Sequence, residues 1–414
     1  MREQVAALGG IRVLDLGRVL SGPLCGRILA DLGADVIKIE PPAGDDGRHF
    51  GPFYDGVSSY HRLLNRNKSG ITLDLKSDEG RRTLAGLVER SDVLIENFRP
   101  GVLDRLGFPP ARLLELNPRL VAVSISGFGR TGPLSGQPAY DLIVQAASGL
   151  MSVTGPDGGP AARVGVSLGD IVPGMYAANA VLAALHQRAR SGRGQHIDVA
   201  MFDGLLSILE SVAMRALLTG EPIEPTGSHH AISAPFGTFA TRDEPIAVAV
   251  ANDPLFAALA AALGHPEWTG DARFRTDAER GRNRDELRKE LEAALAGRTR
   301  DEAIAVLSAA GVPCGPVLDV RESLRHPQAE ARGMVRTEAD GFPTLDNGFR
   351  IAGSRTDTVP APALGQHDDL VAGWLDEPVR THEPARPGEA GEAGEAGEAG
   401  GRARPGAGRE ASDV

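Results

Sequence analysis

This sequence of 414 residues has few cysteines, no long apolar run and fewer basic than acidic residues. Its two cysteines, Cys25 and Cys314, give neither a disulfide framework nor a zinc-ligand spacing, so we expect free thiols in a reducing compartment. No segment has the ~18 uninterrupted apolar residues of a membrane helix, and the first residues lack the apolar core of a signal peptide. The formal net charge of −11 argues against nucleic-acid binding. We therefore expect a soluble, cytoplasmic protein with neither a membrane nor a nucleic-acid partner.

Several phosphate, dinucleotide and metal motifs are also absent. The sequence has no Gly-x-x-x-x-Gly-Lys-Ser/Thr loop, no Gly-x-Gly-x-x-Gly after its first strand-like segment and no His-Glu-x-x-His. His229 and His230 are adjacent, and adjacent side chains do not share one face of a helix or strand. We therefore predict no metal site.

One short catalytic pattern is present. Residues 165–169 read Gly-x-Ser-x-Gly, the nucleophile elbow of α/β-hydrolases, and follow a strand-like run at 161–166. A glycine-rich chain matches so short a pattern by chance, and no His-Gly-Gly-Gly oxyanion segment precedes it. A thioester hydrolase that uses Ser167 therefore stays as an alternative function.

Strand-like and helical segments alternate over the first two hundred residues. Segments 12–16, 35–40, 72–75, 93–96 and 120–125 favour strands, whereas 24–32 has helical spacing and Ser77 precedes a helix that begins with acids. Such alternation indicates βαβ units with a mostly parallel sheet. We predict an α/β fold with helices on both faces of the sheet.

The rest of the chain changes character twice. A long amphipathic helix is expected at 202–218, a hairpin at 237–250 and helices at 255–263, 284–296 and 300–310. We assign 1–220 to a large α/β domain, 225–325 to a smaller α+β domain and 326–378 to a return to the large domain. Residues 381–414 repeat Glu-Ala-Gly and contain almost no large apolar side chains, so we predict a disordered tail.

Asp170 has two possible roles. It begins a strong helical pattern at 171–190, and Asp is a preferred N-cap, which explains it without any chemistry. A helix N-terminus also favours a carboxylate by about 0.3–1 kcal/mol, and an oriented carboxylate is a nucleophile towards activated acyl groups. Gly169, just before it, leaves room for a substrate.

A local basic run contrasts with the acidic whole. Its members are Arg62, Arg66, Lys68, Lys76, Arg81 and Arg82. A solvated face is the usual explanation, but the run also suits a ligand with several phosphates. Asn97-Phe98-Arg99 follows a strand-like segment, where open α/β sheets bind ligands.

A set of ordered segments resembles the class III CoA-transferases, the CaiB/BaiF family, which includes formyl-CoA and carnitine CoA-transferases and α-methylacyl-CoA racemases. The matching segments are Val-Leu-Asp at 13–15, Leu-Gly-Ala-Asp-Val-Ile-Lys-Ile-Glu at 32–40, Leu-Asp-Leu-Lys at 73–76, Glu-Asn-Phe-Arg-Pro-Gly at 96–101, Asn-Pro-Arg-Leu at 117–120, Ser-Gly-Phe-Gly at 126–129 and Gly-Val-Pro-Cys-Gly-Pro at 311–316. The resemblance covers residues 9 to about 376.

This resemblance implies a Rossmann-like large domain, a smaller inserted domain and an intertwined, ring-like homodimer. It makes Asp170 the nucleophile, which forms a mixed anhydride with an acyl group and then an aspartyl-CoA thioester. Backbone N–H groups near Gly169 are suited to steady the oxyanions. Acyl-CoA and a small carboxylic acid are the expected substrates, with no permanently bound cofactor.

The resemblance also implies site residues. Those matching CoA contacts are Val19, Leu73, Asp74, Leu75, Lys76, Asn97, Phe98 and Arg105, and those expected near the nucleophile are Leu20, Tyr140, Asp141 and Gly169. His229, Ser233 and Phe236 are possible acceptor contacts, in a region where formyl-CoA transferases have a glycine-run loop.

Four departures from the family pattern narrow the function. Pro41 and Pro138 replace basic CoA contacts, and Leu20 replaces a glutamine of formyl-CoA transferases, so formyl/oxalate exchange is doubtful. Residues 139–141 read Ala-Tyr-Asp where racemases carry a catalytic His, so CoA transfer is favoured over racemisation or epimerisation. A non-catalytic CoA-binding protein remains a further alternative.

Overall fold

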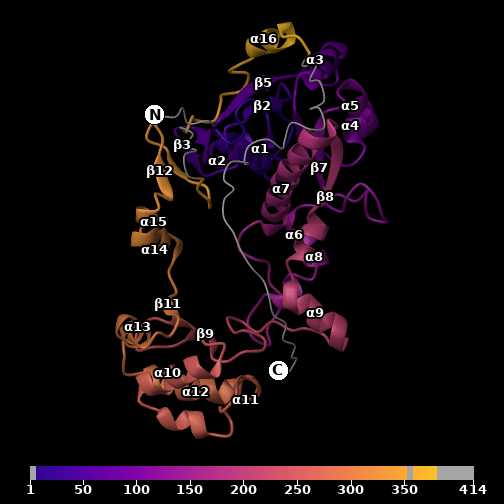
Figure 1. The fold of residues 1–414 in the computed structure, drawn as a ribbon. Helices are drawn as coiled ribbons and strands as arrows, with labels where there is room; N and C mark the ends of the chain where they lie inside the picture. Colours follow the sequence, from indigo (N-terminus) through magenta and orange to yellow (C-terminus); the bar gives the residue numbers. More distant parts are fainter. Residues whose placement is uncertain (1–5, 352–357, 380–414) are drawn as a thin grey trace, which may run out of the picture.

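A six-stranded parallel sheet organises the larger part of the molecule (Figure 1). The computed structural model describes residues 6–351 and 358–379, so the predicted tail at 381–414 lies outside the described residues. The strands run in the order β5 (Lys68–Thr72), β2 (Asp35–Glu40), β1 (Arg12–Asp15), β6 (Val93–Glu96), β7 (Val121–Ser126) and β8 (Gln195–Ala200). The chain adds strands outwards from β1 on one side and then from β6 on the other, which is the Rossmann order.

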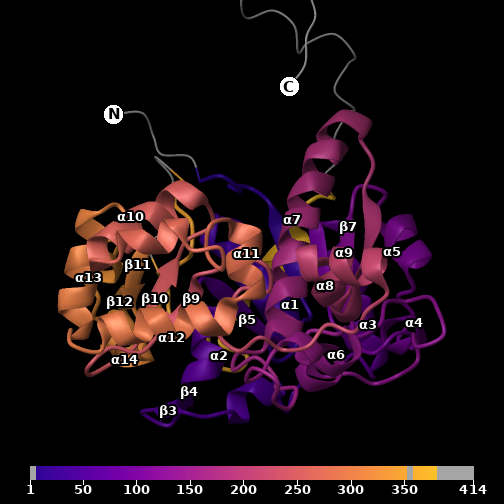
Figure 2. The same ribbon diagram turned by 90° about the horizontal axis from the view of Figure 1, so that it is seen from below.

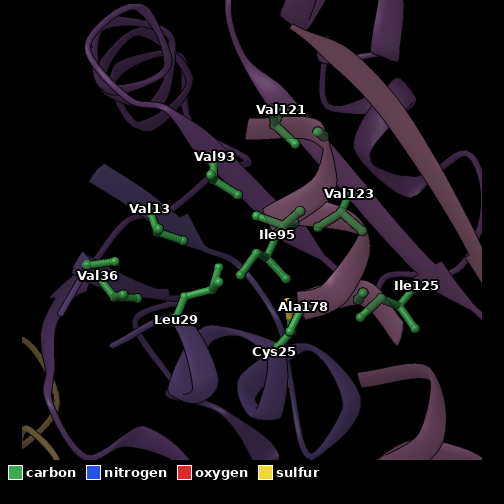
Figure 3. Packing of buried hydrophobic residues seen from close by; sticks show 14 of the residues in the cluster. Val13, Cys25, Leu29, Val36, Val93, Ile95, Val121, Val123, Ile125 and Ala178 are labelled. Carbon is green, nitrogen blue, oxygen red and sulfur yellow. The ribbon is translucent and has the colours of Figure 1, made fainter. Parts of the chain in front are cut away.

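Apolar side chains on both faces of the strands explain why helices cover both sides of the sheet. Val13, Val93, Val121 and their neighbours pack with α1 (Ser21–Asp31) and α7 (Leu168–Ser191) on one face, as Figure 3 shows. The alternate strand residues pack with α3 (Asp78–Glu89), α5 (Pro110–Leu116) and α16 (Leu370–Asp376) on the other. The predicted α/β class with a parallel sheet is confirmed.

Shorter elements occupy the connections of this part of the chain. They are η1 (Asp46–His49), β3 (Phe53–Tyr54), β4 (Val57–Ser58), α2 (Ser59–Asn65), α4 (Val102–Arg105), α6 (Asp141–Ala147), η2 (Met151–Val153), α8 (Met201–Ser207) and α9 (Glu210–Thr219). Helix α7 has the length and composition of a membrane-crossing helix, but it packs along α1, β7 and β8 within the protein core.

A second core lies away from the sheet (Figure 1), and Figure 2 shows it from below, with its helices coloured orange. It is formed by β9 (Phe236–Phe239), β10 (Ile246–Ala249) and β11 (Cys314–Pro316), together with α10 (Asp253–Leu263), η3 (Pro266–Gly270), α11 (Asp277–Arg282), α12 (Arg284–Leu295) and α13 (Arg300–Ala309). Strands β9 and β10 are antiparallel, which confirms the predicted hairpin.

The segment after this second core runs back to the sheet along one side of the molecule (Figure 1). It passes through α14 (Val320–Leu324), α15 (Pro327–Ala331), β12 (Val335–Thr337) and β13 (Pro343–Leu345) before α16. Trp374 of α16 is buried beside α3, and the Arg12 guanidinium lies over its ring. Two separate connections therefore join the two cores, and the ribbon has an open, ring-like outline.

Three expected elements differ from the structure. The helix expected at 202–218 is two helices, α8 and α9, and the Ser207 hydroxyl at the end of α8 donates to the Gly204 carbonyl. The strand expected at 72–75 lies earlier, as β5, and after Thr72 the chain turns, with the Asp74 carboxylate accepting the Lys76 N–H at 3.0 Å. Segment 161–166 is irregular, because its Val164 N–H donates to a glutamine side chain instead of a strand partner.

Candidate active site

The loops that follow β1, β5 and β6 meet at one edge of the sheet, because the three strands are parallel. This edge therefore gathers Val19 and Leu20 after β1, segment 73–76 after β5, and Asn97 and Phe98 after β6. Strands β1 and β6 flank the point where the strand order reverses, which is where open α/β sheets bind ligands.

Asp170 lies in the first turn of α7, the helix that packs against α1. It is not the N-cap: the helix begins at Leu168, so Ser167 takes that position and makes no side-chain capping bond. Burial raises the pKa of Asp170 to about 7, and the negative charge of Asp141 adds to this shift. Within the part of the chain that the structure describes, the Asp170 carboxylate has no hydrogen-bond or ion-pair partner.

Asp141 organises the surroundings of Asp170. It is buried at the start of α6, and its carboxylate accepts hydrogen bonds from the Gly169 N–H at 2.9 Å and the Gln145 amide at 2.8 Å. It also pairs with the Arg163 guanidinium at 2.8 Å. The adjacent Tyr140 is 76% exposed. Of the expected tyrosine–acid pair, only the acid is held against the start of α7.

The first N–H groups of α7 already have acceptors. Those of residues 168, 170 and 171 donate to the carbonyls of Val166 and Ser167, and that of Gly169 donates to Asp141. The expectation that these groups steady an oxyanion is therefore wrong for this arrangement, because each donor is already engaged.

Tyr60 is a neighbour of Asp170 that the sequence did not reveal. This residue of α2 packs against the buried cluster of Leu20, Leu24 and Leu64, and so does Ile171, the residue after Asp170. Burial raises the pKa of the Tyr60 phenol, and the charge of Asp170 adds to the increase. Tyr60 lies outside every matched segment, so no spacing or motif marked it. Leu20 belongs to the buried cluster against which Ile171 packs, so it lies near the start of α7.

The expected CoA contacts take different positions along the edge. Asn97 turns inwards: its side chain accepts the Arg18 N–H at 2.7 Å and donates to the Arg18 carbonyl at 2.9 Å. Phe98 packs partly against the core below, and its N–H donates to the buried Glu96 carboxylate at 2.8 Å. Arg105 is exposed beside a shallow hollow of about 600 Å³.

The four side chains of segment 73–76 differ in their exposure to solvent. Leu73 and Leu75 pack partly against the core, whereas Asp74 and Lys76 are exposed. Half of the basic run is unavailable to a ligand, since three members are buried in ion pairs. These are Arg62 with Glu338 at 2.5 Å, Arg66 with Asp31 at 2.7 Å and Lys68 with Asp15 at 2.7 Å. Of the run that suits a ligand with several phosphates, only Lys76, Arg81 and Arg82 remain outside these buried ion pairs.

Segment 229–236 belongs to the second core. Ser233 donates to Asp277 at 3.1 Å, and His229 stacks edge-on against Phe239. No contact joins this segment to Asp170 in the described part of the chain. The described residues also contain no group of three or more His, Cys, Asp or Glu side chains that is arranged to hold a metal ion.

The serine of the Gly-x-Ser-x-Gly pattern is not on a nucleophile elbow. No strand leads into Ser167, and no histidine contacts it among residues 6–351 and 358–379. The one side-chain bond between a serine and a histidine in that range joins Ser124 to His196, on β7 and β8. The structure therefore gives no support to the hydrolase alternative.

Comparisons with known proteins identify the family of this chain. Residues 8–368 match the family model described as CoA-transferase family III. Acetyl-CoA:oxalate CoA-transferase of Acetobacter aceti is 45% identical over 83% of this chain and 89% of its own, and succinate–glutarate CoA-transferase of Agrobacterium fabrum is 38% identical over 93% and 99%. A crystal structure of a CaiB/BaiF family protein from Brucella suis superposes with a TM-score of 0.80 at 38% identity, covering 89% of this chain and 99% of that one. The chain therefore belongs to CoA-transferase family III and is a CoA-transferase.

Proposed function

We propose that the enzyme moves coenzyme A from an acyl-CoA donor to a carboxylic acid acceptor through covalent intermediates on Asp170. The observation that carries the proposal is the state of this carboxyl group. It is partly buried, unpaired among the described residues, and has its pKa raised to about 7. Asp170 is therefore ionised in about half of the molecules near neutral pH. An ionised carboxylate without a cationic partner is an effective nucleophile towards a thioester.

The reaction splits into two symmetrical halves. The Asp170 carboxylate attacks the thioester carbonyl of the donor, the C–S bond breaks, and the CoA thiolate leaves a mixed anhydride behind. The thiolate then attacks the aspartyl carbonyl, which releases the donor acid and leaves an aspartyl-CoA thioester. The acceptor carboxylate displaces the thiolate to form a second anhydride, and the thiolate attacks the acceptor acyl carbonyl to regenerate Asp170.

CoA lies along the edge of the sheet in this proposal, with its thiol end near Val19 and Asp170. Lys76 and Arg105 are exposed there and suit the phosphates, while Phe98 offers an aromatic ring. Since Asn97 already binds the backbone of Arg18, we propose that it acts mainly by shaping the loop that meets the thiol end.

Dicarboxylic acids are the proposed acceptor class. The support comes from the relatives, whose names specify oxalate, glutarate and succinate. Leu20 still argues against formyl/oxalate exchange, so the acid chain length has to be measured. Racemisation is not favoured, because residues 139–141 offer no histidine base.

We also propose that the enzyme is a cytoplasmic homodimer. The support is a set of large apolar side chains on α7 and α9 that are exposed in the single chain, namely Met175, Tyr176, Met214, Leu217 and Leu218. Leu217 and Leu218 are each nearly four-fifths exposed, which is unusual for side chains that face water permanently. Light scattering at micromolar concentration tests this, and a monomer contradicts it.

The decisive experiment traps the intermediate. During turnover with acyl-CoA donors and a dicarboxylate panel, hydroxylamine should convert Asp170 to a hydroxamate that peptide mass spectrometry detects, and Asp170→Ala should show none. An unmodified Asp170 peptide during measured turnover contradicts the mechanism. A fluorophosphonate label on Ser167 with loss of thioester cleavage in Ser167→Ala instead supports a hydrolase. CoA binding without exchange for any acid supports a non-catalytic CoA-binding protein.

A further inference from the structure

The loop between β1 and α1 carries an uncommon backbone conformation beside Asp170. Val19 has a φ of 63°, in the left-handed region that β-branched residues strongly avoid. Such a conformation persists only where the surrounding structure holds it, and it often occurs at functional sites. The groups that hold Val19 therefore deserve identification.

Side chains from three other elements bind the backbone just before Val19. The Gly17 N–H donates to Asp15 at 2.8 Å, and the Gly17 carbonyl accepts from the Lys38 ammonium. Asn97 binds both the N–H and the carbonyl of Arg18. Side chains therefore hold the backbone of Gly17 and Arg18, between the Leu16 N–H, which donates to the Ile95 carbonyl of β6 at 2.8 Å, and the Leu20 carbonyl, which accepts the Leu24 N–H of α1 at 2.8 Å.

Asp45 holds Val19 itself. The Val19 N–H donates to the two Asp45 oxygens at 3.1 and 3.2 Å. The buried Asp45 carboxylate also pairs with the Lys38 ammonium at 2.9 Å and accepts the Gly47 N–H at 3.0 Å, while Glu40 accepts the N–H of Asp45 at 2.9 Å. Burial opposes ionisation of Asp45, but Lys38 and these N–H groups lower its pKa to about 2. Asp45 is therefore a fixed anion near neutral pH.

The other side of the loop packs towards the start of α7. Leu20 is buried against Leu24 and Leu64, with Tyr60 and Ile171 packed around them. Ile171 follows Asp170 in α7, so the path of the chain at Val19 sets how Leu20 sits against the start of that helix. A relaxed Val19 moves Leu20 relative to the reacting carboxylate.

We propose that Asp45 is a positioning residue for catalysis, which holds Val19 in its left-handed conformation and so places Leu20 against the turn that carries Asp170. This inference rests on the proposed role of Asp170 as nucleophile. Small displacements of positioning groups lower rates by up to about a hundredfold, so the effect is expected in kcat rather than in stability alone.

A double-mutant cycle tests the proposal. Asp45→Ala should lower kcat at least about tenfold, with KM for acyl-CoA changed less than about threefold. In the Val19→Gly background the same substitution should lower kcat by about threefold or less, because glycine adopts positive φ without a holding group. Asp46→Ala is the matched control, since Asp46 is exposed, pairs only with Arg18 and should leave kcat unchanged.

Two results overturn the proposal: an equal loss of kcat from Asp45→Ala in both backgrounds, or an equal loss from Asp46→Ala. If Asp45→Ala does not fold, as circular dichroism would reveal, the same cycle is run with Asp45→Asn, which keeps the size and one acceptor oxygen. Val19→Gly should again reduce the loss, and its failure to do so also overturns the proposal.

A second measurement does not depend on the chemistry of Asp170. Hydrogen exchange of peptides covering 17–21 should be at least about tenfold faster in Asp45→Asn than in the unmodified enzyme, with no such change in Asp46→Ala. Unchanged exchange overturns the role of Asp45 even if Asp170 forms the adduct. A missing adduct with faster exchange overturns the proposed function and leaves the holding contact intact.

Discussion

The Asp141 carboxylate lies close enough to Asp170 to raise the pKa of that carboxyl group, while it binds the N–H of Gly169 at 2.9 Å. The protein gives the two carboxylates different numbers of hydrogen-bond donors. Asp141 receives a guanidinium, a side-chain amide and a backbone N–H, whereas Asp170 receives no donor from the described residues. Pairs of acids whose environments differ in this way commonly divide their roles, one ionised for structure and one tuned for reaction.

The first prediction concerns the pH dependence of the first chemical step. Since burial and Asp141 raise the pKa of Asp170 to about 7, kcat/KM for acyl-CoA should rise about tenfold per unit below pH 7 and level off above it. Asp141→Asn removes a negative neighbour, lowers the pKa of Asp170 and should move the profile to lower pH by at least about half a unit. Rapid-quench measurements of the rate of adduct formation between pH 5 and 9 check this prediction. A shift of the pH profile of Asp141→Asn to higher pH contradicts it.

The second prediction concerns stability. A carboxyl group whose pKa is higher in the folded than in the unfolded protein destabilises the fold once the pH exceeds the unfolded value, and this penalty is complete above the folded value near 7. Asp170→Asn should therefore stabilise the enzyme, by about 2–4 kcal/mol at pH 8 and by less at pH 5. Thermal unfolding at both pH values measures the difference. An equal gain at the two pH values, or a loss at pH 8, contradicts the raised pKa.

The third prediction compares Gly169, which directly precedes Asp170, with Gly165, which lies five residues before it. A Cβ on Gly169 would lie 2.6 Å from Val144 Cγ2 and 3.0 Å from Asp141 Oδ1, so the start of α7 has to move. Gly169→Ala should lower kcat at least about tenfold. Gly165→Ala is the matched control, because a Cβ there meets nothing within 4 Å, and its kcat should stay within about twofold. Equal activities of the two variants contradict the close packing around Gly169.

The sequence predicted β1, β2, β6 and β7 well, because each is a short apolar run between turn-forming residues, as at 35–40 and 93–96. It placed β5 too late in the chain and did not predict β8, where Gln195, His196 and Asp198 interrupt the apolar pattern. Through the family resemblance it singled out Asp170, which lies in the first turn of α7, and Leu20, whose cluster Ile171 packs against. It did not predict Tyr60 or Asp45, whose positions depend on how the η1–α2 region folds over the edge of the sheet. Local pattern carries no information about such long-range packing.

The partners of the basic residues were the property least predictable from the sequence. A run of basic residues has the same sequence pattern whether its members face water or acids far along the chain. Arg62 meets Glu338, which lies 276 residues away, and Lys68 meets Asp15. The family resemblance predicted Asn97 as a CoA contact, but it did not reveal that Asn97 turns towards the backbone of Arg18.

The last prediction follows from the buried basic residues. Lys68 and Asp15 are both fully buried, and Lys68 also donates to the Pro23 carbonyl and the Asn65 side chain at 2.9 Å each. Burial lowers the pKa of Lys68 to about 8, although Asp15 opposes this, so the ammonium is still mostly charged near neutral pH. Lys68→Met leaves the Asp15 charge buried without its cation and should lower the free energy of unfolding by about 3–5 kcal/mol.

The exposed Lys289 on α12 provides the matched control, since Lys289→Met should change the free energy of unfolding by no more than about 0.5 kcal/mol. Adding Asp15→Asn to Lys68→Met should restore part of the loss, because the unpaired buried charge is then removed. Urea unfolding of the four proteins measures these differences. Similar effects of Lys68→Met and Lys289→Met, or no recovery in the double variant, would show that the ion pair does not hold the β1–β5 region together.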